Sequence, residues 1–307
     1  DPVAYRRLKK HIRDVQPDIV HTWLFAGNAY GRKAALAAGV KHIVAGERCV
    51  DRWKRWPHFA IDRYLAKRTD AIVTNTAGVR DFYAAHGIPS GKFHIIANGV
   101  ELPQVMHDDQ RILLHEQILR ELGLPEGTKL IGAVGRLWPQ KNYKHLFWAM
   151  CLLKEIRQDF HLLIFGEGPH RWRLERYGRQ VQILGEHVTL MGERDDVVRF
   201  LPAMRCYVNA SQYEGQSNGI LEAMACGLPV VATDIPGNCD LVVDNVTGSL
   251  VELGDRAELA RRVNALLDDA TLAAKQGAAG RQRMKDEFSV RQMAEAHARL
   301  YRDLASE

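Results

Sequence analysis

The sequence contains few cysteines, and they show no paired spacing. Five occur among 307 residues, none of them in a CxxC pattern: Cys49, Cys151, Cys206, Cys226 and Cys239. This distribution disfavours a zinc site and is typical of reduced thiols in a cytosolic protein. The chain also lacks any apolar run near the roughly 20 residues that a membrane-spanning helix needs, and no signal-peptide pattern opens it. We therefore expect a cytoplasmic protein.

Two common nucleotide-binding motifs are absent as well. No GxGxxG follows a predicted strand, which disfavours a nicotinamide dinucleotide site, and no GxxxxGK[ST] motif occurs, which disfavours a P-loop. The composition is 46% hydrophobic and 26% charged, with a net charge of +5. These values predict a globular chain of about two domains. The mild basic excess suits an anionic substrate or an anionic membrane surface.

Apolar, β-rich segments alternate with helical patterns along the chain. Strands are predicted near Asp18–Thr22, His42–Ala45, Ala71–Asn75 and Phe93–Ala97, and six more follow from Leu130 onward. This alternation predicts α/β architecture, with parallel sheets in two doubly wound domains. Ligands of such folds bind at the carboxyl ends of the strands.

The stretch from Glu214 to Gly227 predicts a short capped helix bordered by two acids. Ser217 or Asn218 can cap its start, and Gly227 suits a left-handed C-terminal cap. Side chains on a helix lean toward its amino end, so Glu222 is expected to point back toward Glu214. The two carboxylates would border a volume rich in backbone N–H groups, which suits an anionic or polyhydroxyl ligand. The alternative is that Glu222 only complements the helix dipole.

Two other loops follow buried strands. Arg136 and Lys141 lie in "GRLWPQKN", where two cations beside a helix start would suit a diphosphate, although a solvated basic loop is the alternative. Gly166 and Gly168 lie in "FGEGP", where the backbone can approach a ligand closely. Glycines after strands are common, so the second motif alone is a weak signal.

Taken together, these motifs resemble the retaining glycosyltransferases of family four, which have the GT-B fold. "EGQSNGILEAMACGLPVVATDIPGNCDLVVDNVTGSLV" is similar to the two-glutamate block of that family, and "VGRLWPQKN" and "IFGEGPHRWRLE" resemble two further blocks in the same order. "PDIVHTW", "ANGVEL" and "FSVRQM" resemble its amino-terminal half and closing helix. The resemblance covers nearly the whole chain, most specifically its carboxyl half.

The resemblance implies a role for each matched residue. Glu214, Arg136 and Lys141 would be catalytic, with Glu214 on the hydroxyls of the donor sugar and the two cations neutralising the diphosphate as it leaves. Glu222 would hold the ribose hydroxyls. The remaining donor-binding residues would be Gly215, Gln216, Ser217, Asn218, Gly166, Gly168, Met191 and Gly192. The resemblance implies metal-independent catalysis without a cofactor, and the sequence contains no DxD metal motif.

Two features depart from the family pattern. Family members begin with a Gly-rich loop after the first strand, which this sequence lacks, so we expect roughly the first 70–100 residues of a whole enzyme to be absent. Many members also carry a histidine after the strand that ends near Ala45, where this sequence has Glu47 and Arg48. Glu47 and Arg48, together with His21, are candidate acceptor-side residues. A packed or solvent-facing side chain is the alternative for His21.

The predicted architecture is therefore GT-B, two Rossmann-like domains facing across a cleft, with an incomplete amino-terminal domain. Residues 1–103 would form the acceptor-side domain, residues 104–285 the nucleotide-sugar domain, and residues 286–307 a helix that packs back toward the first. The basic and aromatic stretch Arg52–Arg68 could meet an anionic bilayer or a lipid-linked acceptor, or could form an ordinary amphipathic helix.

The predicted function is transfer of a sugar from a UDP- or GDP-sugar to a saccharide or lipid-linked acceptor, in polysaccharide or glycoconjugate synthesis. The expected partners are that donor and acceptor, without nucleic acid, and with a membrane contact left open at the inner face. Two alternatives remain. One is a fragment that binds the nucleotide sugar without turnover, and the other is a sugar-nucleotide epimerase with the same fold.

Overall fold

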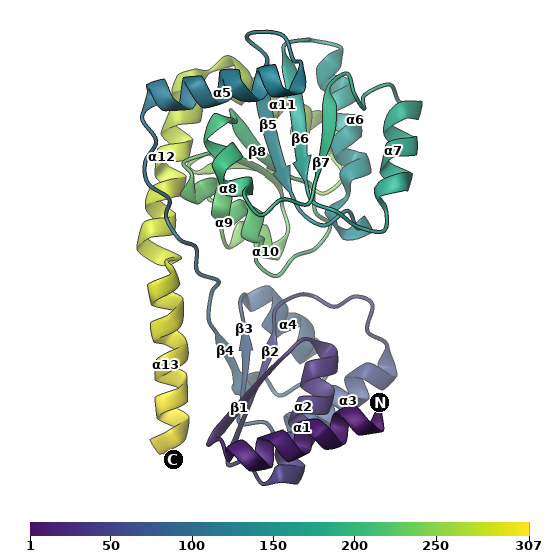
Figure 1. Ribbon diagram of the computed structural model, residues 1–307, viewed down its shortest axis with the longest axis vertical. Helices are drawn as coiled ribbons and strands as arrows, with labels where there is room; N and C mark the ends of the chain where they lie inside the picture. The colour runs from purple at the N-terminus through teal and green to yellow at the C-terminus, as the bar shows by residue number, and fades with distance from the viewer. Residues whose placement is uncertain (307) are drawn as a thin grey trace. The chain divides into compact units, whose positions relative to one another are not determined.

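The computed structural model describes residues 1–306, which form two compact units (Figure 1). Unit 1 comprises residues 1–99 together with the carboxyl-terminal helix, and unit 2 comprises residues 100–289. All paired strands within each sheet are parallel. The predicted α/β class with two parallel sheets is confirmed.

Unit 1 contains a four-stranded sheet in the sequential order β1-β2-β3-β4. Its strands are β1 (Ile19–Trp23), β2 (His42–Glu47), β3 (Ala71–Thr74) and β4 (Phe93–Ile95). Its helices are α1 (Pro2–Val15), α2 (Phe25–Ala38), α3 (Trp56–Ala66), α4 (Ala77–Ala85), the 3-10 turn η1 (Ser90–Lys92) and α13 (Val290–Ser306).

The helix α13 belongs to the core of unit 1 although it lies almost 200 residues after β4 in the sequence. Its Leu300 and Leu304 are buried in one cluster with Val44, Val73 and Ile96 of the sheet region. Burying one leucine side chain contributes about 1.5–3 kcal/mol, so these contacts anchor the helix to the sheet.

Unit 2 contains a six-stranded sheet in the order β10-β9-β8-β5-β6-β7. Its strands are β5 (Lys129–Val134), β6 (Phe160–Phe165), β7 (Val188–Gly192), β8 (Cys206–Asn209), β9 (Val230–Thr233) and β10 (Gly248–Val251). Its helices are α5 (Asp108–Leu122), α6 (Tyr143–Lys154), α7 (Arg171–Gln180), α8 (Val197–Phe200), α9 (Asn218–Ala225), α10 (Pro236–Cys239), α11 (Arg256–Asp268) and α12 (Ala270–Glu287), with the 3-10 turns η2 (Pro139–Lys141) and η3 (Leu201–Ala203).

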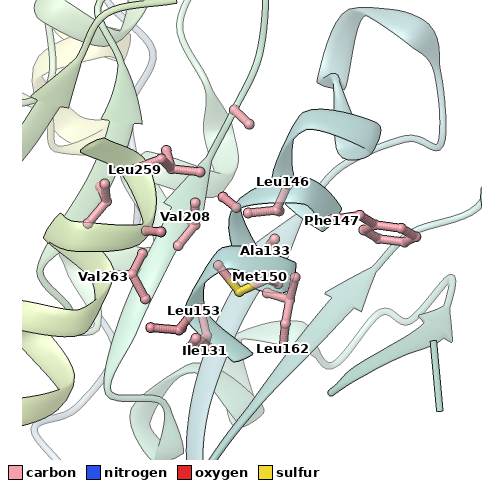
Figure 2. Packing of buried hydrophobic residues seen from close by; sticks show 14 of the residues in the cluster. Ile131, Ala133, Leu146, Phe147, Met150, Leu153, Leu162, Val208, Leu259 and Val263 are labelled. Carbon is pink, nitrogen blue, oxygen red and sulfur yellow. The ribbon is translucent and has the colours of Figure 1, made fainter. Parts of the chain in front are cut away.

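The largest core cluster lies between this sheet and helices α6 and α11 (Figure 2). Leu146, Met150 and Leu153 recur at helical spacing on α6, and all three are fully or almost fully buried. They pack in the same cluster as Ile131 of β5 and Val263 of α11. This packing holds β5, and therefore the loop that follows it, in a rigid position.

The sequence pattern predicts no helix at α5, where it places only the boundary between the two domains. Asp108 and Asp109 instead form the first turn, where acidic side chains complement the helix dipole. Ile112 and Leu113 are more than half exposed, and only Ile118 and Leu119 of this helix are buried. The apolar periodicity of α5 is therefore too weak to identify it without its tertiary contacts.

Candidate functional site

The candidate site follows from the strand order of unit 2. The chain runs outward from β5 in one direction through β6 to β7, and in the other through β8 to β10. Ligands of doubly wound sheets bind outside the carboxyl ends of the strands at the point where this direction changes. Here that point lies between β5 and β8, which are followed by residues 135–142 and 210–217.

The structure brings Lys141 and Glu214 together at this point. The ammonium of Lys141 lies 2.5 Å from Oε1 of Glu214. Ser211 donates its hydroxyl to the same oxygen at 2.7 Å, and Gln140 donates its amide to Oε2 at 3.2 Å. The Glu214 side chain is only 8% exposed, so the pair is largely desolvated. The sequence reasoning did not identify Ser211, which lies in the same loop as Glu214, or Gln140, whose contact crosses from the loop after β5.

The start of α9 provides backbone donors beside this pair. Ser217 is the N-cap, and its side-chain oxygen accepts from the backbone N–H of Ile220, which decides between the two predicted caps. Gly215, Gln216 and Ser217 are buried, whereas Asn218 is exposed. Free N–H groups at a helix start attract anions, so this end of α9 suits a phosphate or an electron-rich hydroxyl.

Glu222 lies one turn further along α9 and is partly buried. Burial raises the pKa of its carboxyl. The described residues include no hydrogen-bond or ion-pair partner for this carboxylate. Burial also raises the pKa of Tyr207, and the charges of Glu222 and Glu214 raise it further, so both acids lie near one buried phenol. A partly buried carboxylate without a partner is well suited to accept hydrogen bonds from a ligand.

The glycine positions are explained by contacts between neighbouring loops. Gly166 has φ +138°, and a β-carbon there would lie 2.3 Å from the carbonyl oxygen of Gly135. A β-carbon on Gly168 would lie 2.6 Å from the carbonyl oxygen of Leu137. The backbone of Gly166 also donates to Gly192 at 2.7 Å, which joins the loop after β6 to the end of β7. These glycines let three strand-end loops pack together, a reason that the sequence reasoning did not give.

The remaining predicted residues of unit 2 lie around the same edge. Arg136 is exposed and lies over the ring of Trp138, at 5.3 Å from its centroid. Met191 is partly buried near the end of β7. A groove of about 1110 Å³ lies elsewhere in unit 2, at the amino ends of β5, β8 and β9. None of the predicted site residues lines it, and ligands of doubly wound sheets bind at the opposite edge.

In unit 1 the structure places Glu47 inside a buried ionic network rather than at an open surface. Its carboxylate accepts from Asn28 at 2.9 Å and from Tyr83 at 2.9 Å, and it lies 3.4 Å from the ammonium of Lys54. Lys54 is fully buried and also pairs with Asp62 at 3.0 Å. This placement argues against Glu47 as an acceptor contact, because both its oxygens already have protein partners.

His21 lies within β1, two residues before its end, and Arg48 directly follows β2. Both contact the indole of Trp23: the imidazole stacks on it with ring centroids 4.2 Å apart, and the guanidinium carbon lies 5.2 Å from the ring centroid. The hydroxyl of Tyr301 on α13 is hydrogen-bonded to Nδ1 of His21 at 2.7 Å. His21 is thus packed through its ring face and Nδ1, while its Nε2 has no hydrogen-bond partner among the described residues.

The stretch around α3 combines buried and exposed aromatic residues. Phe59 is buried, whereas Trp53 is 54% exposed and Trp56 is 78% exposed. The exposed residues around them include five cations and one acid: Arg52, Arg55, Arg63, Lys67, Arg68 and Asp70. The exposed side chains of this stretch are therefore mostly basic, with two exposed indoles among them.

A stability measurement tests the partly buried state of Glu222. Folding raises its pKa, so the protonated carboxyl stabilises the folded chain at low pH, and this contribution is lost as pH rises through the raised pKa. Glu222→Gln removes the charge, and we expect it to raise the Tm of the empty protein at pH 7 by about 1–3 °C. The gain should shrink as pH falls. A Tm unchanged at every pH would contradict this account, and Glu252→Gln on the exposed surface is the control.

Two surveys of the described residues complete the geometry. They contain no group of three or more His, Cys, Asp or Glu side chains arranged to hold a metal ion. In residues 1–306, no helix combines the length and the apolar character that crossing a membrane requires.

Sequence comparisons match both units of the chain to glycosyltransferase families. The family described as Glycosyltransferase Family 4 matches residues 1–104, and the family described as Glycosyl transferases group 1 matches residues 128–269. A 2-deoxystreptamine glucosyltransferase of Streptomyces kanamyceticus is 30% identical over 80% of this chain and 63% of its own length. A UDP-Gal:alpha-D-GlcNAc-diphosphoundecaprenol alpha-1,3-galactosyltransferase of Escherichia coli is 30% identical over 87% of this chain and 70% of its own length.

A solved structure supports the same fold. The Anabaena protein HepE, in complex with UDP-glucose, superposes with a TM-score of 0.85 at 19% identity, covering 99% of this chain and 82% of HepE. The chain has the GT-B fold in both of its units, and it belongs to family four of the glycosyltransferases.

Proposed function

We propose that this glycosyltransferase moves a sugar from a UDP- or GDP-sugar to an acceptor hydroxyl, with retention at the anomeric carbon and without a metal. The pairing of Lys141 with Glu214 carries the proposal, since it places a cation and a carboxylate beside the start of α9. Glycosyltransferases similar to this chain include one whose name specifies UDP-Gal and a diphosphoundecaprenol-linked acceptor.

In the proposed reaction, the bond between the anomeric carbon and the β-phosphate oxygen breaks. A new bond forms to the acceptor oxygen on the same face of the sugar, and the hydroxyl proton leaves with the nucleoside diphosphate. Lys141 and Arg136 stabilise the charge that develops on the diphosphate, a form of electrostatic stabilisation by preorganised groups. Glu214 then accepts hydrogen bonds from the sugar hydroxyls, and Glu222 accepts them from the ribose.

We propose a saccharide or lipid-linked acceptor, used at the cytoplasmic face of a membrane. The exposed Trp53 and Trp56, surrounded by arginine and lysine side chains, support a lipid-linked acceptor. Aromatic and basic side chains of this kind favour the interface of an anionic bilayer.

Calorimetry with four nucleotides tests the donor site. The wild type should bind UDP or GDP, and the matching 2′-deoxynucleotide should bind about tenfold or more weakly, because one charge-assisted hydrogen bond to Glu222 is lost. Glu222→Ala should weaken binding of the ribonucleotide and remove the difference in affinity between the ribonucleotide and the 2′-deoxynucleotide.

The control is Glu252→Ala, which removes an exposed carboxylate after β10 and should leave both affinities unchanged. If neither UDP nor GDP binds the wild type at millimolar concentration, the donor-site proposal fails. Discrimination between ribose and deoxyribose that survives Glu222→Ala would contradict only the role of Glu222.

A further inference from the structure

An unusual cluster of side chains lies at the carboxyl ends of β1 and β2 in unit 1. It comprises His21, Trp23, Arg48, His297 and Tyr301, and is called the His21–Arg48 cluster below. The ring of His297, on α13, lies 6.1 Å from that of His21 and 6.2 Å from that of Trp23, measured between centroids. The indole of Trp23 remains 40% exposed, so the cluster opens to solvent through an aromatic surface.

Arg48 is partly desolvated and has no carboxylate to balance its charge. Burial lowers the pKa of the guanidinium, which still stays protonated near neutral pH because arginine begins from so high a value. Its recorded contacts are the side-chain oxygen of Asn98 and the face of Trp23. Its Nη1 atom is buried without a hydrogen-bond partner among the described residues. Buried charges in proteins are normally paired, so this guanidinium lacks a counter-charge.

Glu47, the neighbouring acid, does not supply that charge. Its carboxylate is bound by Asn28 and Tyr83 and pairs with Lys54. The pairing of Glu47 with Lys54 therefore leaves Arg48 as an unbalanced cation of the cluster.

His21 contributes a second buried atom without a partner. Burial, together with the nearby charges of His297 and Arg48, lowers the pKa of its imidazole to about 4, so the ring is neutral near pH 7. Its Nδ1 is hydrogen-bonded to the Tyr301 hydroxyl at 2.7 Å, and its Nε2 is buried and unpartnered. With Tyr301 as the donor, the neutral ring carries its proton on Nε2 and offers a second N–H.

We propose that the His21–Arg48 cluster binds an oxyanion, phosphate or carboxylate, carried by the acceptor, with the acceptor sugar against Trp23. The Arg48 guanidinium, which has no counter-charge and an unpartnered Nη1, matches such a group together with the neighbouring unpartnered Nε2 of His21, because guanidinium geometry suits phosphate and carboxylate oxygens. A neutral saccharide would leave Arg48 unbalanced. The inference rests on the proposed function in one respect, namely that the ligand is the acceptor.

Calorimetry of the full chain with saturating UDP tests the proposal, since UDP occupies the donor site and keeps phosphate probes out of it. The probes are glucose 6-phosphate, glucuronate, methyl glucoside and inorganic phosphate. We expect the two anionic sugars to bind about tenfold or more tightly than methyl glucoside. Inorganic phosphate should bind more weakly than glucose 6-phosphate, because it cannot contact Trp23.

Arg48→Gln should reduce the affinity for the anionic sugars to that of methyl glucoside, and Arg48→Lys should give an intermediate value. His21→Ala should lower the affinity for the anionic sugars and leave the affinity for methyl glucoside unchanged. The matched control is Arg299→Gln, which removes an exposed guanidinium from α13. Thermal melting of each variant shows whether the fold is intact.

Equal affinities for glucose 6-phosphate and methyl glucoside in the wild type would overturn the proposal. The proposal would also be overturned if the Arg48→Gln variant bound glucose 6-phosphate as tightly as the wild type does. Equal binding of inorganic phosphate and glucose 6-phosphate would refute the assignment to an acceptor sugar. Titration with UDP alone separates the two proposals: if UDP fails to bind while the anionic sugars are still discriminated, the donor proposal is wrong and the anion site stands.

Discussion

Lys141→Met is expected to lower kcat by about 10²–10³-fold, which is the usual effect of removing one preorganised group that stabilises developing charge. The ammonium lies 2.5 Å from Glu214 and is held at the point between β5 and β8 where the proposed diphosphate would leave. The measurement is the release of UDP or GDP from whichever sugar nucleotide the wild type turns over. Lys141→Arg should retain more of the activity than Lys141→Met.

Lys144→Met provides the matched control. Lys144 is an exposed lysine three residues away on α6, where its ammonium lies over Tyr177. Its loss should leave kcat within about twofold, since it does not contact the Glu214 pair. Addition of EDTA should leave the wild-type rate unchanged if Lys141 and Arg136 supply the positive charge. A Lys141→Met enzyme that keeps kcat within tenfold of wild type would contradict the proposed role.

Lys54→Met is expected to destabilise the protein by about 3–5 kcal/mol, because removing one partner of a buried ion pair leaves the other charge uncompensated. The ammonium is fully buried between three carboxylates, at 3.0 Å from Asp62 and 3.4 Å from both Glu47 and Asp51. It also donates to the hydroxyl of Tyr83 at 2.9 Å. The measurement is chemical or thermal unfolding followed by circular dichroism.

The pH dependence of the stability lost in Lys54→Met gives a sharper test. Burial raises the pKa of Glu47 and the Lys54 charge lowers it, so loss of Lys54 should raise it further. A carboxyl with a raised pKa stabilises the fold when protonated and loses this contribution as pH rises through that pKa. The deficit of Lys54→Met should therefore shrink as pH is lowered from 7 toward 5. If Lys54→Met lost no more stability than Lys67→Met, which removes an exposed lysine at the C-cap of α3, the network would contribute little.

Much of the local structure could be predicted from the sequence. The strands β1 to β4 lie within a few residues of their predicted ranges, because apolar patterns act over a few neighbours. Ser217 and Gly227 do begin and end α9 as their residue types suggest. One exception is α5, whose exposed Ile112 and Leu113 do not mark a buried face.

The partners of the charged side chains could not be predicted in the same way. Lys141 and Glu214 are 73 residues apart and meet only because β8 pairs with β5. Glu47 is the last residue of a buried strand, where a site residue is expected, yet its carboxylate is enclosed by Asn28, Lys54 and Tyr83. A strand-end position in the sequence does not show whether a side chain faces solvent or another charge.

By itself, the sequence determined the alternating strands and helices, the capped helix α9, and the presence of two cations and two acids at strand ends. The tertiary structure alone decided the strand order that pairs Lys141 with Glu214, the burial of Lys54, and the contact of Tyr301 with His21 across 280 residues. The reason is physical: propensities and caps act over one or two turns of chain, whereas desolvation and ion pairing depend on which distant segments pack together.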